Sequence, residues 1–148
     1  SLKEENLDAF TERFLKLAAD EIIPEQMTPQ IDIDAVLDLK DINTKFMSEL
    51  KKMNPFGPDN QKPVFCSLNV KDYGTSKLVG KELEHIKLEL IDDKSNTPIH
   101  GIAFGMRQHN THIKNMKPFN ICYTIEENTY NGNTSLQLMV KDIKENDI

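Results

Sequence analysis

The sequence has few of the residues that mark secreted, membrane or cofactor-binding proteins. Its 148 residues include two cysteines, six glycines and no tryptophan. Cys66 and Cys122 each lie in an apolar alternation, and they are too few for a disulfide-stapled secreted domain. We therefore expect two buried thiols in the cytoplasm, with a disulfide or a two-cysteine metal site as the alternative. No apolar run approaches the roughly 20 residues of a membrane helix, so we expect no membrane contact.

The common short motifs of catalysis and metal binding are also missing. The sequence contains no CxxC, no HExxH and no glycine-rich phosphate loop. His109 and His112 have the spacing of a helical metal pair, but no third ligand is evident, so we expect solvated side chains. Asp32 and Asp34 share one face of an expected strand, but an exposed acidic strand explains them better than a pair of catalytic carboxylates. An independent enzyme is thus not favoured, and we assign this chain no catalytic residue and no metal ligand.

Charge is distributed unevenly along the chain. Residues 1–60 carry 7 basic and 13 acidic side chains, whereas residues 61–148 carry 11 of each. This asymmetry suggests two segments with different roles. Residues 62–117 have a modest basic excess, with nine basic against six acidic side chains. Such an excess predicts at most weak and salt-sensitive attraction to a nucleic acid.

The first third of the chain predicts helices. Residues 4–21 form an amphipathic pattern whose apolar positions share one face: Leu7, Phe10, Phe14, Leu17 and Ala18. The alternation QIDID at residues 30–34 predicts a short strand. Asp41 or Asn43 could cap a second helix that runs to about Met53. Its expected inner face consists of Ile42, Phe46, Leu50 and Met53.

The rest of the chain predicts strands. Five alternating segments are found, at Val64 to Val70, Ile86 to Leu90, Ile99 to Gly105, Phe119 to Ile125 and Leu136 to Val140. Met106 to about Lys114 suits a short helix, and Asn131-Gly132 is a strong hairpin signal. Five strands with a helix after the third predict an α+β chain with a five-stranded OB-fold barrel at residues 54–148. Residues 1–53 would form a mainly helical connecting segment. An open α+β sandwich is the alternative.

A proline- and phenylalanine-rich stretch, NPFGPDNQKPVF, separates the second helix from the first strand. We expect Pro55 to end the helix, and Gly57 and Asn60 can adopt turn angles that other residues resist. We expect Phe56 and Phe65 to anchor this turn in apolar surface. The alternative is that Phe56 stacks on a nucleic-acid base.

Four motifs in order resemble the RecJ family of bacterial single-stranded-DNA exonucleases. They are PFGPDN followed by PVF, then HIKLEL, IAFG and ENTYNGNTSLQLMVKDI. The resemblance covers nearly the whole chain. Two departures affect local detail: Asp59 stands where the family usually has glycine, and Tyr130 where it often has tryptophan.

The resemblance carries expectations about a longer protein. RecJ-like enzymes are DHH phosphoesterases whose metal ligands lie in domains that this sequence lacks. The chain would then be the end of a DHH-associated domain plus an OB domain, and alone it should not cut DNA. The parent would be a 5′→3′ exonuclease of DNA repair and recombination that uses Mn²⁺ or Mg²⁺. Expected partners are single-stranded DNA, the catalytic domains of the same chain, and a replication or repair protein.

Candidate DNA contacts follow from the strand alternations and the loops. With the apolar positions inward, Ser67, Asn69 and Lys71 point outward on the first strand, and His85, Lys87 and Glu89 on the second. OB-folds bind oligonucleotides on their second and third strands and adjoining loops. The candidate contacts are Lys71, His85 and Lys87 on the strands, Tyr73, Lys77 and Lys81 in the first loop, and Asn128 and Tyr130 at the last hairpin. Lysines would attract phosphates and tyrosines would stack on bases. Alternatively, the lysines are only solvated and the tyrosines only cap the barrel or the hairpin. The chain would then be a module that docks other proteins.

Overall fold

The computed structural model describes residues 3–22 and 29–146. The chain divides into two compact units, Ser1–Asp32 and Ile33–Ile148, and each is described by itself. Within the described ranges, no helix combines the length and the apolar character needed to span a membrane.

The first unit contains the predicted amphipathic helix. A 3₁₀ turn, η1 (Glu4–Asn6), leads into α1 (Leu7–Glu21), which confirms a helix at residues 4–21. The rings of Phe10 and Phe14 stack with their centroids 5.9 Å apart. The large apolar side chains of α1 are more than half exposed: Leu7, Phe10, Phe14, Leu15 and Leu17. The described residues of this unit therefore leave an apolar face of α1 uncovered.

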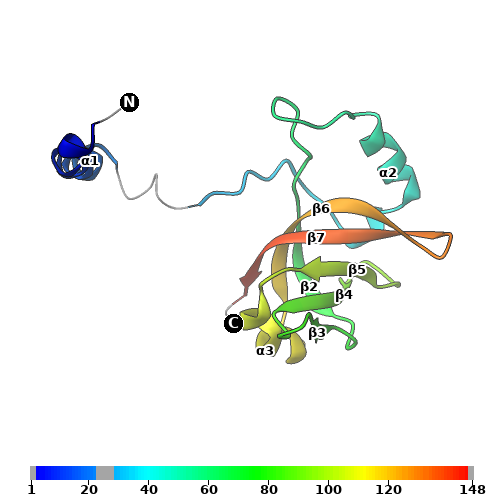
Figure 1. The fold of residues 1–148 in the computed structure, drawn as a ribbon. Coiled ribbons are helices and arrows are strands. Elements are labelled where there is room, and N and C mark those ends of the chain that lie inside the picture. The colour runs from blue at the N-terminus through cyan, green and yellow to red at the C-terminus, as the bar shows by residue number, and fades with distance from the viewer. Residues whose placement is uncertain (1–2, 23–28, 147–148) are drawn as a thin grey trace. The chain divides into compact units, whose positions relative to one another are not determined.

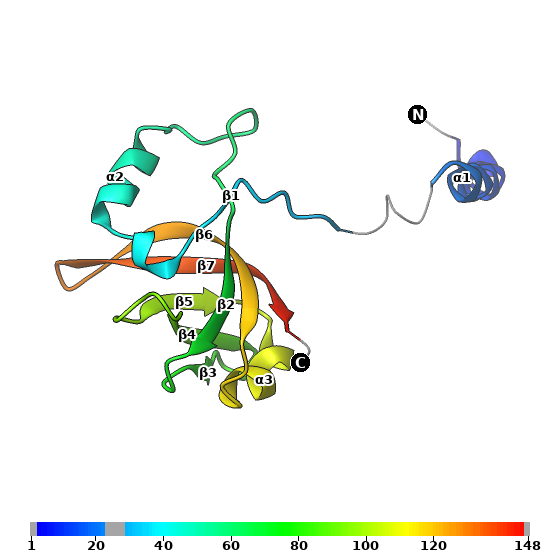
Figure 2. The same cartoon turned by 180° about the vertical axis from the view of Figure 1, so that it is seen from behind.

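The second unit is a closed five-stranded barrel. Its strands are β2 (Phe65–Asp72), β4 (His85–Ile91), β5 (Ile99–Ala103), β6 (Phe119–Tyr130) and β7 (Asn133–Glu145). The ring runs β2–β4–β5–β7–β6 and returns to β2, with only β5 and β7 parallel. Figure 1 shows β7, β5 and β4 on one side of the barrel, and Figure 2 shows β2 and β6 on the other. This connectivity confirms the OB-fold.

A sixth segment of sheet was not predicted. Strand β3 (Lys77–Val79) pairs antiparallel with the outer edge of β4. Lys77 was expected in a loop, which is wrong, because it begins β3. Three residues are too short to show an alternation, which is why the pattern missed this strand.

The ring closes through a short seam between β2 and β4. Only two positions pair there, Lys71 with Ile91 and Asp72 with Leu90. The Asp72 side chain is buried at this seam. Its Oδ1 accepts a hydrogen bond from the Ser76 N–H at 3.1 Å, and Lys114 Nζ lies 3.7 Å from Oδ2. By contrast, β6 and β7 pair along almost their full lengths.

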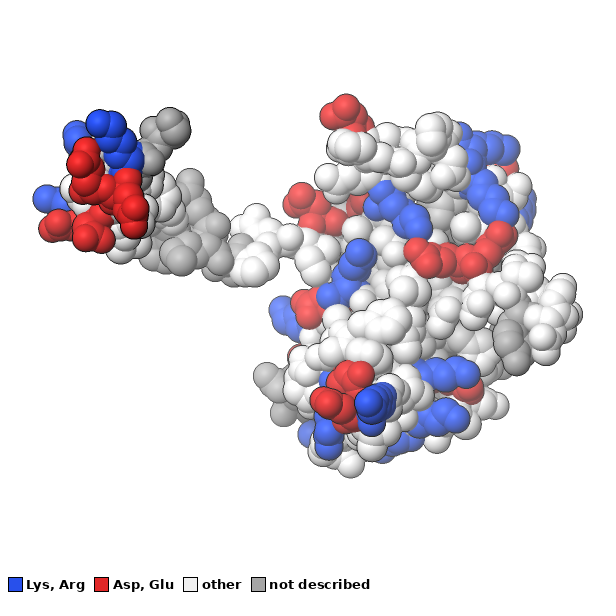
Figure 3. Space-filling model, viewed as in Figure 1, with Lys and Arg blue, Asp and Glu red and all other residues white. Residues whose placement is uncertain are grey.

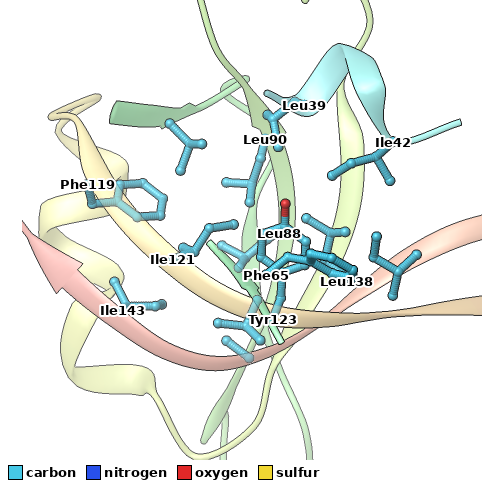
Figure 4. Close-up of a cluster of buried hydrophobic side chains, with 14 of the residues drawn as sticks. Leu39, Ile42, Phe65, Leu88, Leu90, Phe119, Ile121, Tyr123, Leu138 and Ile143 are labelled. Carbon is cyan, nitrogen blue, oxygen red and sulfur yellow. The ribbon is translucent and has the colours of Figure 1, made fainter. Parts of the chain in front are cut away.

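The core fills the barrel and both of its ends (Figure 4). Its largest fully buried apolar side chains are Tyr123, Phe119, Ile86, Leu88, Leu90, Ile113, Ile121, Ile125, Leu138 and Val70. The short helix predicted after the third strand is confirmed as η4 (Arg107–His109) and α3 (Asn110–Lys114). Ile113 of α3 is fully buried, so the helix closes one end of the barrel.

Strand β2 departs from the predicted alternation. Leu68 was expected inside but is 50% exposed, and Ser67 was expected outside but is 1% exposed. A register shift between Ser67 and Val70 causes this change, with Asn69 at a φ of 55°. A bulge adds a residue to one strand, so the alternation changes phase there. Ser67 therefore enters the core, and its hydroxyl lies 2.7 Å from the Tyr123 hydroxyl.

Both cysteines are free thiols on this strand pair. Cys66 and Cys122 are directly opposed positions of β2 and β6. Cys66 is buried and Cys122 is half-buried. Burial raises the pKa of each thiol above its ordinary value. The pair therefore stays protonated at neutral pH and unreactive, since the thiolate is the nucleophilic form.

The segment before the barrel begins with a strand that was predicted at the wrong place. Residues 30–34 form no strand, and β1 (Ala35–Val36) follows them, parallel to β2. The position of β1 is set by its backbone pairing with β2 and not by the polar–apolar alternation of QIDID. Ile31 and Ile33 are both exposed.

The second helix forms as predicted and packs on the barrel. A 3₁₀ turn, η3 (Leu39–Asp41), precedes α2 (Thr44–Lys51). The Asn43 side chain caps α2 by accepting the Phe46 N–H at 3.0 Å. The expected inner face is right for Leu50, which is buried, but wrong for Met53, which is 50% exposed. Met53 lies beyond the end of the helix, where the helical spacing no longer applies.

Residues 33–53 thus belong to the compact unit of the barrel. Leu39, Ile42 and Leu50 lie in the same buried cluster as the strand residues. The compact unit that contains the barrel starts at Ile33. The domain boundary that we predicted between residues 53 and 54 stays a prediction.

The stretch after α2 folds into a tight corner. The backbones of Gly57 and Asn60 exchange hydrogen bonds of 2.8 and 3.2 Å. The Asn60 carboxamide donates to the carbonyl oxygens of Met53 and Pro55, at 2.8 and 3.0 Å. Phe56 is partly buried against the core. Neither Gly57 nor Asn60 has a positive φ, so the expectation of special turn angles is wrong, and these hydrogen bonds form the corner between α2 and β2 instead.

Candidate nucleic-acid interface

One outer face of the barrel carries a row of side chains across four strands. Ile86 and Leu88 of β4 point inward, so Lys87 between them points outward. Directly paired positions share a face of a sheet. The row across β3, β4, β5 and β7 therefore consists of Lys77, Lys87, Ile102 and Met139. Two lysines thus stand beside two apolar side chains on the face that OB-folds use for oligonucleotides.

The next row along the strands is polar. It consists of Glu89 on β4, His100 on β5 and Gln137 on β7. The Glu89 carboxylate accepts a hydrogen bond from the Thr75 hydroxyl, and its other oxygen lies 3.6 Å from His100 Nδ1. A pocket of about 420 Å³ opens beside this row. Its lining consists of Lys87, His100, Asn128, Ser135 and Gln137.

An exposed aromatic side chain lies at the end of β5. Phe104 is 55% exposed, and its ring meets the His85 ring edge-on at a centroid distance of 4.9 Å. His85 Nδ1 accepts the Gly105 N–H at 3.0 Å, and its Nε2 lies 3.3 Å from Glu84. These contacts hold the His85 ring in place beside Phe104. His85 thus supports an aromatic surface that a base could stack on.

The sequence analysis missed Phe104 and Ile102 as candidate contacts. The segment HGIAFG carries the signal, because its small residues alternate with its large ones. Gly101 and Ala103 are buried, and a Cβ at Gly101 would lie 3.4 Å from the Leu138 carbonyl oxygen. Small residues therefore face the crowded core, which turns Ile102 and Phe104 outward.

The other predicted contacts are spread around this face. Lys71 lies opposite Ile91 and pairs with Asp93 at 3.5 Å, at the far end of β4 from His85. Tyr73 is 51% exposed. Lys81 is exposed between β3 and β4.

Two of the remaining predicted contacts belong to the β6–β7 hairpin. Asn128 lines the pocket together with Lys87. Tyr130 ends β6, and its side chain lies outside the described part of the chain. The structure thus brings Lys77, Lys87 and Asn128 together and leaves Lys71 apart from them.

Charged groups surround a largely uncharged area of this face. In Figure 3, both basic and acidic side chains lie around an uncharged area over the barrel. Hydrogen bonds from the backbone N–H groups of Glu84 and Glu82 lower the pKa of the Glu84 carboxyl, so it remains charged. Among the described residues, no group of three or more His, Cys, Asp or Glu side chains could hold a metal ion.

Comparison with known proteins identifies the family. The model of the RecJ OB domain matches residues 33–142. The chain belongs to this family. The RecJ OB match begins at the same residue as the compact unit of the barrel.

The curated relatives that match this chain are longer RecJ proteins. The single-stranded-DNA-specific exonuclease RecJ of Haemophilus influenzae is 25% identical over 145 residues, which is 97% of this chain. The enzyme of the same name from Salmonella typhimurium is 23% identical over 146 residues. This chain spans only about a quarter of the length of each relative, with 25% and 24% covered.

Solved structures confirm the fold. RecJ from Thermus thermophilus in complex with Mg²⁺ superposes with a TM-score of 0.74 at 17% identity, covering 100% of this chain and 21% of that one. The corresponding complex with Mn²⁺ gives a TM-score of 0.74 at 16% identity, covering 20% of that chain.

Proposed function

We propose that this chain is the single-stranded-DNA-binding OB module of a RecJ-like exonuclease. The observation that carries the proposal is the row of Lys77, Lys87, Ile102 and Met139 on the outer face of β3, β4, β5 and β7. Cations and apolar groups stand side by side there on a binding face of the fold. Membership of the RecJ OB family supports the same function.

The side chains on this face divide into two kinds of contact. Lys77 and Lys87 lie directly opposite one another and would neutralise neighbouring phosphates. Ile102 and Phe104 would pack against base faces, and stacking on an aromatic ring contributes roughly 1–3 kcal/mol per base. A duplex hides those faces, so the site would prefer a single strand. With only two lysines in this row, we expect weak and strongly salt-dependent binding.

The cleaving chemistry would belong to DHH domains of a longer chain, with Mn²⁺ or Mg²⁺ as the metal. The lengths of the curated exonucleases support this arrangement, since this chain spans about a quarter of them. The OB module would guide the strand toward that site for 5′→3′ cleavage. Such an enzyme would act in the cytoplasm in DNA repair and recombination.

The proposal is tested by titrating the 148-residue chain with a labelled single strand and with its duplex, at low and at physiological salt. We expect preference for the single strand and loss of affinity as salt rises. Lys77→Ala and Lys87→Ala should each weaken binding and reduce the salt slope by about one. Lys45→Ala on α2 is the matched control and should leave both unchanged. Equal affinity of all three variants would refute the assignment of this face.

A second candidate function is a docking module for the catalytic domains or for a replication or repair protein. The uncovered apolar face of α1 favours it, because exposed contiguous apolar surface marks interaction sites. Phe10→Ser should then abolish association with the partner and leave DNA affinity unchanged. Conversely, the lysine variants should not affect association.

A further inference from the structure

The hairpin that joins β6 and β7 differs in character from the lysine row. Its residues 128–135, NTYNGNTS, carry no charge and consist almost entirely of amide and hydroxyl side chains. Asn131 and Gly132 form the turn with φ values of 50° and 80°. The two strands remain paired up to Tyr130 and Asn133, and the hairpin extends to one side of the barrel in Figure 1. Such a hairpin offers hydrogen bonds but no positive charge that would attract phosphates.

The base of this hairpin forms one wall of the pocket on the binding face. Asn128 and Ser135 are directly opposed positions of the hairpin, and Gln137 lies opposite His100 of β5. Lys87 stands at the rim, and it belongs also to the lysine row. The pocket volume of about 420 Å³ lies in the range of small-ligand sites. One planar ring system would fit in this volume.

Some polar side chains in and beside the pocket already have a partner within the protein, and others do not. Glu89 is held by Thr75 and His100, and Glu126 is ion-paired with Lys62 at 2.8 Å. Within the described residues, the carboxamides of Asn128 and Gln137 have no protein hydrogen-bond partner. Each carboxamide presents donor and acceptor groups side by side, which is the pattern that base edges match.

We propose that this pocket receives one unstacked nucleobase of the bound strand. Asn128 and Gln137 would hydrogen-bond the edge of the base, and Lys87 would contact the phosphate of the same nucleotide. The inference rests on the proposed function and adds to it a fixed register. One nucleotide of the strand would be held by its base, while its neighbours are held by phosphate and by sequence-tolerant packing.

The two kinds of contact predict different salt behaviour. Losing a lysine that neutralises a phosphate lowers the slope of affinity against salt. Losing a carboxamide that binds a base should weaken binding by the same factor at every salt concentration. The Asn128→Ala/Gln137→Ala double variant should therefore keep the wild-type salt slope, in contrast to Lys87→Ala.

The decisive experiment uses oligonucleotides that lack one base. A series of single-stranded oligonucleotides is prepared with one abasic nucleotide at each successive position, and the affinity of the whole chain for each is measured. For the wild type we expect one position, or two adjacent ones, where the missing base weakens binding by roughly two- to tenfold, the effect of about one hydrogen bond. For the Asn128→Ala/Gln137→Ala variant this penalty should disappear.

Controls separate the possible failures. Asn133→Ala removes a hairpin carboxamide outside the pocket lining and should keep the full abasic penalty. Urea unfolding of each variant shows whether the barrel is intact. An abasic penalty that stays the same in the double variant overturns the pocket assignment and leaves the DNA-binding function standing. Absence of single-strand binding by the wild type at low salt refutes the proposed function itself, and the pocket assignment with it.

Discussion

The buried hydroxyl chain of the core predicts an unequal response to two small substitutions. Ser67 Oγ lies 2.7 Å from the Leu37 carbonyl oxygen and 2.7 Å from the Tyr123 hydroxyl. A carbonyl only accepts, so the Ser67 hydroxyl donates to Leu37, and the Tyr123 hydroxyl must donate to Ser67. Both Ser67 and Tyr123 are almost completely buried.

The direction of these hydrogen bonds decides the expected magnitudes. Tyr123→Phe removes one donor and leaves the Ser67–Leu37 hydrogen bond in place, so it should cost about 1 kcal/mol of unfolding free energy. Ser67→Ala leaves the buried Tyr123 hydroxyl and the Leu37 carbonyl without a partner, which should cost about 2–3 kcal/mol. The double variant should be less destabilised than Ser67→Ala, because the orphaned phenol is gone.

Urea unfolding of the four proteins tests this reasoning. With a slope of about 2 kcal/mol per molar, Ser67→Ala should shift the midpoint by roughly 1 M and Tyr123→Phe by about half as much or less. The slope itself should not change. A Ser67→Ala protein that is no less stable than Tyr123→Phe would refute the assigned donor directions, and so would strictly additive costs.

Three further predictions concern pH and helix capping. Burial raises the pKa of Tyr123 above the value of about 10 for an exposed tyrosine. Its contribution to the free energy of unfolding is therefore complete below about pH 10 and is lost as the pH rises toward the folded-state pKa. The Tyr123→Phe variant should therefore lose less stability at alkaline pH than the wild type. Burial alone would raise the pKa of Asp92, but the hydrogen bond from the Leu39 N–H at 2.8 Å and others hold it below the ordinary value. Its contribution is present above about pH 4 and is lost as pH falls through the lowered pKa, so the stability difference between wild type and Asp92→Asn should shrink in acid. Asn43→Ala removes the cap of α2 and should cost about 1 kcal/mol, visible as a thermal midpoint lowered by roughly 2–4 °C.

The fold could be predicted largely because the apolar alternations are strong and the order of elements is distinctive. Ile86, Leu88 and Leu90 point inward as the alternation indicates, and Asn131-Gly132 forms the expected turn. The errors arise where backbone pairing overrides the pattern. The bulge beside Asn69 changes the phase of β2, so Ser67 enters the core.

The candidate site could be predicted only in part from the sequence. Lys87 was named from the expected alternation and Lys77 from an expected loop, but the unpredicted strand β3 is what places the two opposite one another. Phe104 was missed because a phenylalanine is normally taken as a core residue. Its exposure follows from the small neighbours Gly101 and Ala103, which the crowded barrel interior demands.

The short seam between β2 and β4 has a consequence for the dynamics of the barrel. Local opening takes the least free energy where few strand hydrogen bonds must break, so amides at Lys71 and Asp72 should exchange with solvent before those of β6 and β7. The buried carboxylate of Asp72 lowers the cost of opening further, since exposure to water solvates it. Tyr73 follows this seam directly and donates its N–H to the carbonyl oxygen of Glu89 on β4, at 2.8 Å. The most easily opened joint of the ring therefore includes β4, the strand on which the ligand would lie.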